Sequence, residues 1–280
     1  MRGYDFRREQ TGAGLDRQNL RHPETSEGGM TTTPTRWRRW GGVSGVALAV
    51  LWAPMGVVVW QLPDLSSAAE IERFYRGHAA LLTMALGQAS VGFFFFLAFL
   101  GALVERLRQR EGSGPLTWVA FGSALMLMTS LNIALGLAAA ARLLAAASTS
   151  DTEVAYALHT GAFVAAAPVA FAGTAFFLAA ALLSFRAGVF PRWLAWTAVI
   201  AALVNVGALG GIFSLTGPLN AGNGAIGGPA APILAWVIWI LLASIAMLRE
   251  SRRSPVTPSD HPRHVVQARR PLDHCEHERR

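Results

Sequence analysis

Residues 79–104 read AALLTMALGQASVGFFFFLAFLGALV and contain no charged side chain. A bilayer core of about 30 Å is crossed by about 20 apolar residues in a helix, so this stretch is long enough to span a membrane. A barrel strand would alternate polar and apolar side chains over about 10 residues, which this stretch does not do. Backbone groups in lipid must pair within their own segment, as they do in a helix. The stretch therefore predicts a transmembrane helix.

Five further windows have the same character, and none carries a charge in its central part. We therefore predict an all-α fold, a polytopic transmembrane six-helix bundle with disordered tails. The bundle occupies residues 41–248, between tails at 1–40 and 249–280. Its predicted spans are residues 42–61, 79–104, 116–143, 157–185, 193–215 and 232–248.

The charges are concentrated in the tails. The chain has 24 basic residues, all arginine, and a formal net charge of +7. Each tail holds eight arginines and five acidic residues, whereas the much longer segment between them holds eight and seven. A soluble domain is about 25% charged, so this pattern excludes a soluble globular enzyme. The single cysteine excludes a disulfide scaffold. The charge indicates membrane topology and not a nucleic-acid partner.

Arginines near the span ends predict the orientation. Eleven lie on one side of the predicted bundle and three on the other. Because positive loops stay inside, we expect both termini in the cytoplasm and the chain in the cytoplasmic (inner) membrane. The eleven are Arg36, Arg38, Arg39, Arg106, Arg108, Arg110, Arg186, Arg192, Arg249, Arg252 and Arg253, and the three are Arg73, Arg76 and Arg142.

Both tails are polar and lack apolar periodicity, so we predict that they are disordered. Met30 is an alternative start, because the segment after it has an ordinary N-terminal composition. The C-terminal tail carries His261, His264, His274, Cys275 and His277, but this spacing matches no closed zinc site, and we predict no metal. The lipid bilayer is the expected partner, with contact between the cytoplasmic arginine clusters and anionic headgroups as an addition.

The first outer loop contains a helix signal. Ser66 or Ser67 with Glu70 forms a capping pattern, and Ile71, Phe74 and Tyr75 follow on one helical face. One interpretation is a short amphipathic helix on the outer surface that leads into the second span. The other is a charged lid or ligand clamp.

The last outer loop, residues 216–231, is rich in Gly, Asn and Pro. Such a composition is typical of a flexible connection. A re-entrant segment lining a cavity is the alternative.

Small residues recur at four-residue spacing in two spans. The first span has Gly41, Gly45, Ala49 and Ala53, and the fourth has Ala162, Ala166, Ala170 and Thr174. Close backbone contact drives helix association in lipid, so both ridges are predicted helix–helix interfaces. An alanine-rich composition of the whole chain explains them equally well.

Uncharged amides stand where charges are absent. Gln88, Asn132 and Asn205 lie within predicted spans. Amides in lipid seek hydrogen-bond partners, so the first interpretation is interhelical packing. The second is a ligand-binding cavity at mid-membrane with these three amides in its wall.

A group of ionisable residues is predicted at the outer ends of the second and fourth spans. Its members are Glu72, His78, Asp151, Glu153 and His159. Histidine with carboxylates suits zinc binding or proton sensing, which requires His78 and His159 to lie close together. The simpler interpretation is that each side chain meets water, and we predict no metal, no cofactor and no catalytic residue.

One pattern resembles a known group of proteins. Phe74-Tyr75, the run Phe95-Phe96-Leu97-Ala98-Phe99-Leu100 and the stretch Phe190-Pro191-Arg192-Trp193-Leu194-Ala195-Trp196 are similar to motifs of six-helix integral membrane proteins of unknown function common in high-GC, actinobacterial-type bacteria. Ala195 stands where glycine is usual in that group. The resemblance covers about residues 35–250. It implies a six-helix bacterial membrane protein and carries no activity.

The absence of charged residues within the spans and of any catalytic motif favours a non-enzymatic membrane component with an accessory, structural or stress-related role. A small carrier or channel for a neutral or lipidic substrate is the alternative, supported by Pro54, Pro168 and the three amides. An outer-face metal-binding protein or enzyme using His78 and His159 is the third.

Overall fold

The structure, a computed structural model, describes residues 34–112, 114–147, 152–214 and 216–253, and these ranges contain no strand. Six of the helices are long and apolar enough to cross a membrane, which confirms the predicted all-α transmembrane bundle. The elements are α1 (Pro34–Trp60), α2 (Ala68–Gly77), α3 (Ala79–Glu111), α4 (Pro115–Ala146), α5 (Thr152–Ala187), α6 (Arg192–Ala208), the short 3-10 helix η1 (Leu209–Phe213) and α7 (Ala230–Arg253).

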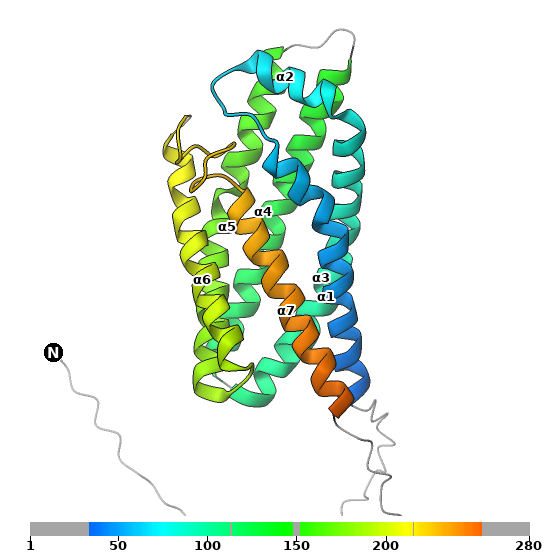
Figure 1. Cartoon of the computed structure of the whole chain (residues 1–280), viewed down its shortest axis with the longest axis vertical. Coiled ribbons are helices and arrows are strands. Elements are labelled where there is room, and N and C mark those ends of the chain that lie inside the picture. Colours follow the sequence, from blue (N-terminus) through cyan, green and yellow to red (C-terminus); the bar gives the residue numbers. More distant parts are fainter. Residues whose placement is uncertain (1–33, 113, 148–151, 215, 254–280) are drawn as a thin grey trace, which may run out of the picture. The chain divides into compact units, whose positions relative to one another are not determined.

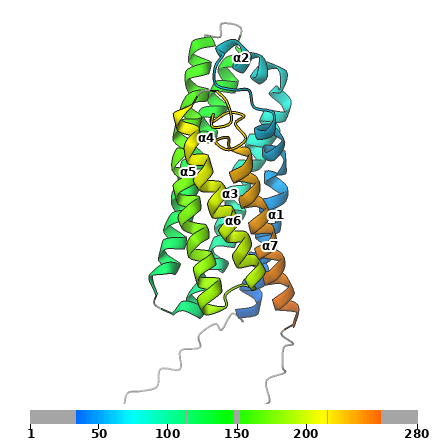
Figure 2. The ribbon, with the colours of Figure 1, turned by 60° about the vertical axis from the view of Figure 1, so that its left-hand side comes forward.

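The six long helices form a closed ring. Neighbours in the ring are α1, α3, α4, α5, α6 and α7 in that order, and α7 packs back against α1. Figures 1 and 2 show these helices running side by side, with α2 lying across one end. We call this the α2 end. The opposite end, where α1 begins and α7 ends, is the Arg106 end.

Five of the long helices extend beyond the predicted spans, whereas α6 ends at Ala208, short of the predicted residue 215, and the chain continues there as η1. Residues 34–40 and 249–253 are helical, although we predicted them as parts of the tails. Proline suits the first turn of a helix, which is where Pro34 stands. The helix α3 continues past residue 104 to Glu111 and ends at Gly112, whose φ of 73° is a conformation that glycine adopts without strain. Length in apolar residues gives the membrane crossing but not the polar turns beyond it.

Several predictions concern residues that the structure does not describe. The disorder of residues 1–33 and 254–280, the alternative start at Met30 and the histidines of the C-terminal tail lie outside the described residues. Asp151 of the outer group does so as well.

Small residues set the packing at the Arg106 end. A Cβ atom on Gly41 would lie 2.1 Å from the Ala102 Cβ, and one on Gly45 would lie 1.9 Å from the Ser244 Oγ. Toward the α2 end the same ridge loosens, because Ala53 is exposed and a Cβ on Gly56 would meet nothing within 4 Å. The ridge is therefore a true interface over its first half only.

Candidate functional site

The helix α2 closes one end of the ring. Ser67 caps it, since its hydroxyl accepts a hydrogen bond of 3.3 Å from the Glu70 backbone N–H, as the capping pattern predicts. Ile71, Phe74 and Tyr75 form its buried face. This face packs on α4 and α5, so the apolar side of the helix is turned toward protein.

Polar contacts hold α2 in place. Arg76 pairs with Glu72 at 2.6 Å and donates from Nε to the Ala145 carbonyl at the end of α4. Glu72 also accepts a hydrogen bond of 2.7 Å from the Thr152 hydroxyl at the start of α5. The Tyr156 hydroxyl donates to the Leu65 carbonyl, which ties α5 to the connection before α2. Arg76 and Glu72, two of the residues predicted on the outer side, thus hold α2 in position over the end of the ring.

Tyr75 of α2 and His159 of α5 contact each other beneath α2. The Tyr75 hydroxyl lies 2.8 Å from His159 Nδ1, and both residues are buried, at 3% and 1% exposure. The Phe163 ring packs edge-on against the imidazole at 4.9 Å. Burial raises the pKa of the Tyr75 phenol above its ordinary value, so the hydroxyl keeps its proton.

The hydrogen bond fixes where the imidazole proton lies. The Tyr75 hydroxyl has no other acceptor in the described part of the chain, so it donates to Nδ1 of His159. A neutral imidazole then carries its own proton on Nε2. Nε2 is buried and has no partner among the described residues, which leaves an N–H donor unsatisfied.

An apolar cavity of about 110 Å³ lies below this pair. Helices α1 to α5 and the start of α7 all contribute to its wall. Among the lining residues, only Trp52, Tyr75 and His159 have a nitrogen or oxygen atom in the side chain. The other lining residues are Met55, Val58, Val59, Leu62, Phe74, Leu82, Leu86, Leu131, Ala134, Leu135, Ala138, Ala162, Phe163, Ala166, Pro229 and Ile233. We call this space the interior cavity.

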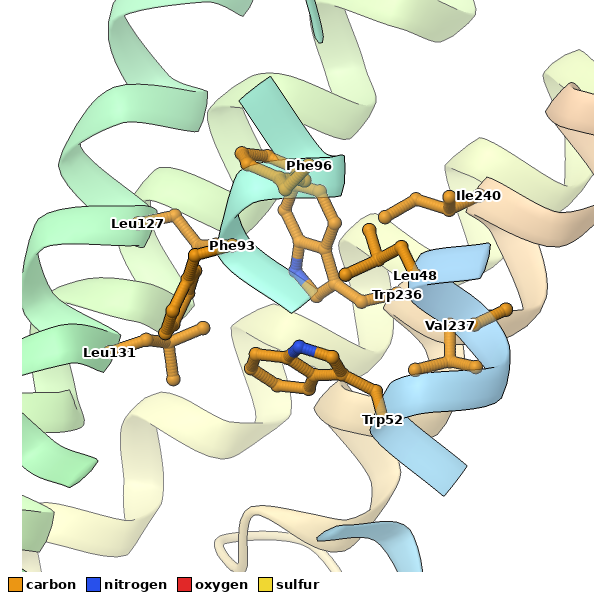
Figure 3. A pocket seen from close by; sticks show the side chains of 10 residues that line it. Leu48, Trp52, Phe93, Phe96, Leu127, Leu131, Trp236, Val237 and Ile240 are labelled. Carbon is orange, nitrogen blue, oxygen red and sulfur yellow. The ribbon is translucent and has the colours of Figure 1, made fainter. Parts of the chain in front are cut away.

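A smaller pocket of about 40 Å³ continues from the interior cavity toward the middle of the bundle and shares Trp52 and Leu131 with it. Figure 3 shows Trp52 from α1, Phe93 from α3 and Trp236 from α7 pointing toward one another around it. The Trp52 indole Nε1 is a second buried N–H without a partner in the described structure.

The connection between η1 and α7 is folded and closes the bundle beside α2. Asn220 builds its turn, because its side-chain oxygen accepts from the Gly222 and Asn223 backbone N–H groups. Ala221, Gly227 and Pro229 line a third pocket, of about 70 Å³, that shares Pro229 with the interior cavity. The Gly- and Asn-rich composition thus specifies a compact turn at the cavity.

A crevice of about 430 Å³ separates α1 from α7 in the half nearer α2. Trp60 and Leu234 at its edges are exposed. Trp52 and Ile233 line both this crevice and the interior cavity, so they stand between the cavity and the outer surface of the ring. We call it the α1/α7 crevice.

The three predicted amides do not come together. Asn132 is exposed and donates to the Met128 carbonyl of its own helix. Asn205 is fully buried and donates to the Ala201 carbonyl, and its oxygen lies against Gly173. Gln88 is half-buried, and none of the three lines the interior cavity. The side-chain nitrogens of Asn132 and Asn205 thus pair within their own helices, whereas the buried Asn205 oxygen has no partner among the described residues.

The predicted outer group is also divided. His78 contacts the Phe74 carbonyl through Nδ1 at 3.0 Å, whereas His159 is bonded to Tyr75. Glu72 is engaged with Arg76 and Thr152, and Glu153 is exposed. Within the described ranges, no three His, Cys, Asp or Glu side chains are placed to hold a metal.

The sequence did not indicate Tyr75 as a polar site residue, nor Trp52 and Arg106 as parts of a site. Tyr75 was counted on the apolar face of α2, and its hydroxyl shows its role only once α5 is in place. Nothing in the sequence distinguishes Trp52 from the other aromatic residues of the spans. Arg106 was counted for topology alone, although its position inside a run that continues as helix is a signal for burial. Comparisons of the chain with protein-family models, with curated proteins and with solved structures found no match.

Proposed function

We propose that this protein is a non-enzymatic membrane component that binds a neutral, lipid-soluble molecule in the interior cavity. The observation that carries the proposal is an almost wholly apolar cavity lined by His159, whose buried Nε2 has no partner among the described residues. The unpaired Trp52 Nε1 lies instead against Gly92 of α3. Unpaired buried donors cost about 1–3 kcal/mol each, and a ligand that offers an acceptor relieves this cost.

The chemistry of the lining favours a class of ligand. Apolar walls exclude a charged molecule, because burying a charge without a partner is costly. The unpaired N–H donor of His159 favours an oxygen acceptor on the ligand, such as the carbonyl of an ester, ketone or quinone. We therefore infer a hydrocarbon body with a carbonyl group near His159.

The α1/α7 crevice is the proposed entrance. It faces the surface that six apolar helices present to lipid, and Trp52 and Ile233 separate it from the cavity. The Arg106 end is tightly packed around Gly41 and Gly45. A crevice between α1 and α7 that is confined to the half nearer α2 favours binding from the bilayer over passage through the protein.

We also propose that the Arg106 end faces the cytoplasm and that the chain lies in the inner membrane of a bacterial cell. The arginine distribution supports this orientation. Exposed tryptophans at the same end, among them Trp40, Trp118 and Trp196, suit a membrane interface. Cys275 is the single cysteine and lies in the C-terminal tail, so a membrane-impermeant maleimide should label it only after the cells are lysed. Labelling of intact cells would reverse the orientation.

The binding proposal is tested with a neutral probe, the methyl ester of a brominated fatty acid. Purified protein is loaded with the probe, passed through a size-exclusion column and analysed for bromine. We expect the ester to be retained and a bromoalkane of equal length to be retained less, because it offers no acceptor. Failure of the wild-type protein to retain the ester would refute the proposal.

Two alanines of α5 give a matched pair of variants. Ala166 lines the interior cavity, whereas Ala157 is exposed. Ala166→Leu fills the cavity and should reduce ester retention at least about tenfold, and Ala157→Leu should leave it unchanged. His159→Phe should abolish the preference for the ester over the alkane. Equal losses in the two alanine variants would show that the probe binds elsewhere.

A further inference from the structure

A second pocket, of about 420 Å³, lies at the Arg106 end between α3, the α5–α6 connection and α7. Its charged lining residues are three arginines and one glutamate, Arg106, Arg110, Arg249 and Glu250. It shares no lining residue with the interior cavity. We call it the arginine pocket, and it is independent of the function proposed above.

Arg106 forms the fixed base of the arginine pocket. Its Nε and Nη2 donate to the Val189 carbonyl at 2.9 and 2.6 Å, and its Nη1 lies 2.5 Å from Glu250. The guanidinium also stacks over the Phe190 ring, 4.8 Å from the centroid. The residue is 7% exposed, so α3, the α5–α6 connection and α7 are joined at a rigid cationic group. Both Nη atoms retain further N–H donors.

Arg110 and Arg249 add charge that the protein does not neutralise. Both are exposed, and within the described residues neither side chain has a hydrogen bond or an ion pair. Glu250 is already engaged by Arg106. The pocket therefore has an excess of positive charge with planar donors, which suits the oxygens of a phosphate group.

The surroundings place this charge at a membrane interface. Trp193 lines the pocket and is 50% exposed, and Trp196 one turn further along α6 is 61% exposed. Exposed tryptophans mark the level of lipid headgroups, and basic pockets between transmembrane helices bind anionic headgroups. We propose that the arginine pocket binds the phosphate group of an anionic lipid, with Arg110 and Arg249 as the contacting residues and Arg106 as the residue that fixes the wall.

The test compares two double variants of full-length protein in nanodiscs that contain phosphatidylglycerol and phosphatidylcholine. Arg110→Gln with Arg249→Gln removes the pocket charges. Arg108→Gln with Arg252→Gln removes the same charge from the same two helices at exposed positions outside the lining. Retained phosphatidylglycerol is counted by native mass spectrometry. We expect the first pair to lower its affinity at least about tenfold and the second pair to lower it less than about threefold.

A second arm separates a lipid phosphate from free phosphate. Inorganic phosphate is added to the wild-type protein in the same nanodiscs. If it leaves the phosphatidylglycerol bound, the site takes the lipid; if it displaces the lipid at millimolar concentration, the site takes phosphate from either source. Both results keep a phosphate site at Arg110 and Arg249. Equal losses in the two double variants, or no loss in either, would overturn the proposal.

Discussion

The two ends of the bundle use similar residues to opposite effect. At the Arg106 end, glycines of α1 lie so close to α3 and α7 that no Cβ fits, and Arg106 joins three elements. At the α2 end, alanines and a glycine border a cavity and a crevice, and a separate helix and a folded connection cover them. Small side chains therefore permit either contact or space, depending on whether another helix fills the gap.

This difference assigns separate roles to the two ends. The packed end fixes the mutual positions of α1, α3 and α7 near the start of α1. The α2 end is held together by a few individual hydrogen bonds between α2 and the helices α4 and α5. We expect substitutions at the Arg106 end to affect the stability of the whole bundle and those at the α2 end to act locally.

The largest effect is expected from Gly45→Ala. The new Cβ would lie 1.9 Å from the Ser244 Oγ and 2.7 Å from the Phe99 ring, so these side chains or α1 itself must shift. We expect a loss of about 3 kcal/mol, seen as a lower unfolding temperature in detergent. Gly56→Ala on the same helix is the control, and its Cβ meets nothing, so we expect a gain of about 0.5–1 kcal/mol. Similar losses in both variants would refute the contrast between the ends.

A somewhat smaller loss is expected from Arg106→Met. This change leaves the Val189 carbonyl without its hydrogen-bond donor and the Glu250 carboxylate without its ion-pair partner. We expect the free energy of unfolding to fall by about 2 kcal/mol. The expected loss is not larger because Glu250 is partly exposed to solvent. Arg108→Met, at an exposed position of α3, should change the free energy of unfolding by no more than about 0.5 kcal/mol. A stable Arg106→Met protein would show that the Arg106 contacts are dispensable.

Tyr75→Phe tests whether the contacts at the α2 end act locally. It removes the hydrogen bond to His159 Nδ1 while keeping the aromatic ring, at a cost of about 1 kcal/mol. We expect faster amide hydrogen exchange in α2 and unchanged exchange at the Arg106 end. Tyr156→Phe, which removes the bond to the Leu65 carbonyl, should instead raise exchange in residues 61–67. Exchange that rises across the whole bundle would contradict a local role.

The smallest effect concerns Asp64 in the connection before α2. Hydrogen bonds from the Ser66 hydroxyl and backbone N–H lower the pKa of this carboxyl below its ordinary value. The stabilisation is present above the ordinary pKa and is lost as the pH falls through the lowered pKa of the folded state. Ser66→Ala keeps the backbone donor, so carbon NMR of the Asp64 carboxyl should show the pKa returning only part of the way. An unchanged pKa would exclude the hydroxyl as its cause.

The spans and the capped helix at Ser67 were predictable because they depend on local rules. Apolar length determines a membrane crossing, and a capping serine with Glu70 and a one-sided apolar face determines a short helix. The end points at Pro34 and Arg253 were not predictable in this way, because polar helical turns outside the hydrocarbon carry no hydropathy signal.

The candidate site was predictable only in part. His159 was singled out, but its partner is Tyr75, a residue 84 positions away that no spacing rule connects to it. The amides drew attention because polar groups in lipid need partners, yet the amide nitrogens of Asn132 and Asn205 donate one turn back in their own helices, and the buried Asn205 oxygen has no partner among the described residues. The cavity results from how six helices diverge, which depends on side chains from several of them at once.

The contact between two connections gives the α1/α7 crevice a spacer. Gly222 lies so close to Pro63 that a Cβ on it would approach the Pro63 carbonyl oxygen to 2.4 Å, so the segment leading into α7 rests on the segment leaving α1. This contact between surface turns adds to the direct packing of α1 on α7 in setting the separation of the two helices at this end. Insertions or deletions in these turns should change the width of the α1/α7 crevice while every transmembrane residue stays the same. Selection on a pair of short connections thus offers a route by which a single helical framework diversifies.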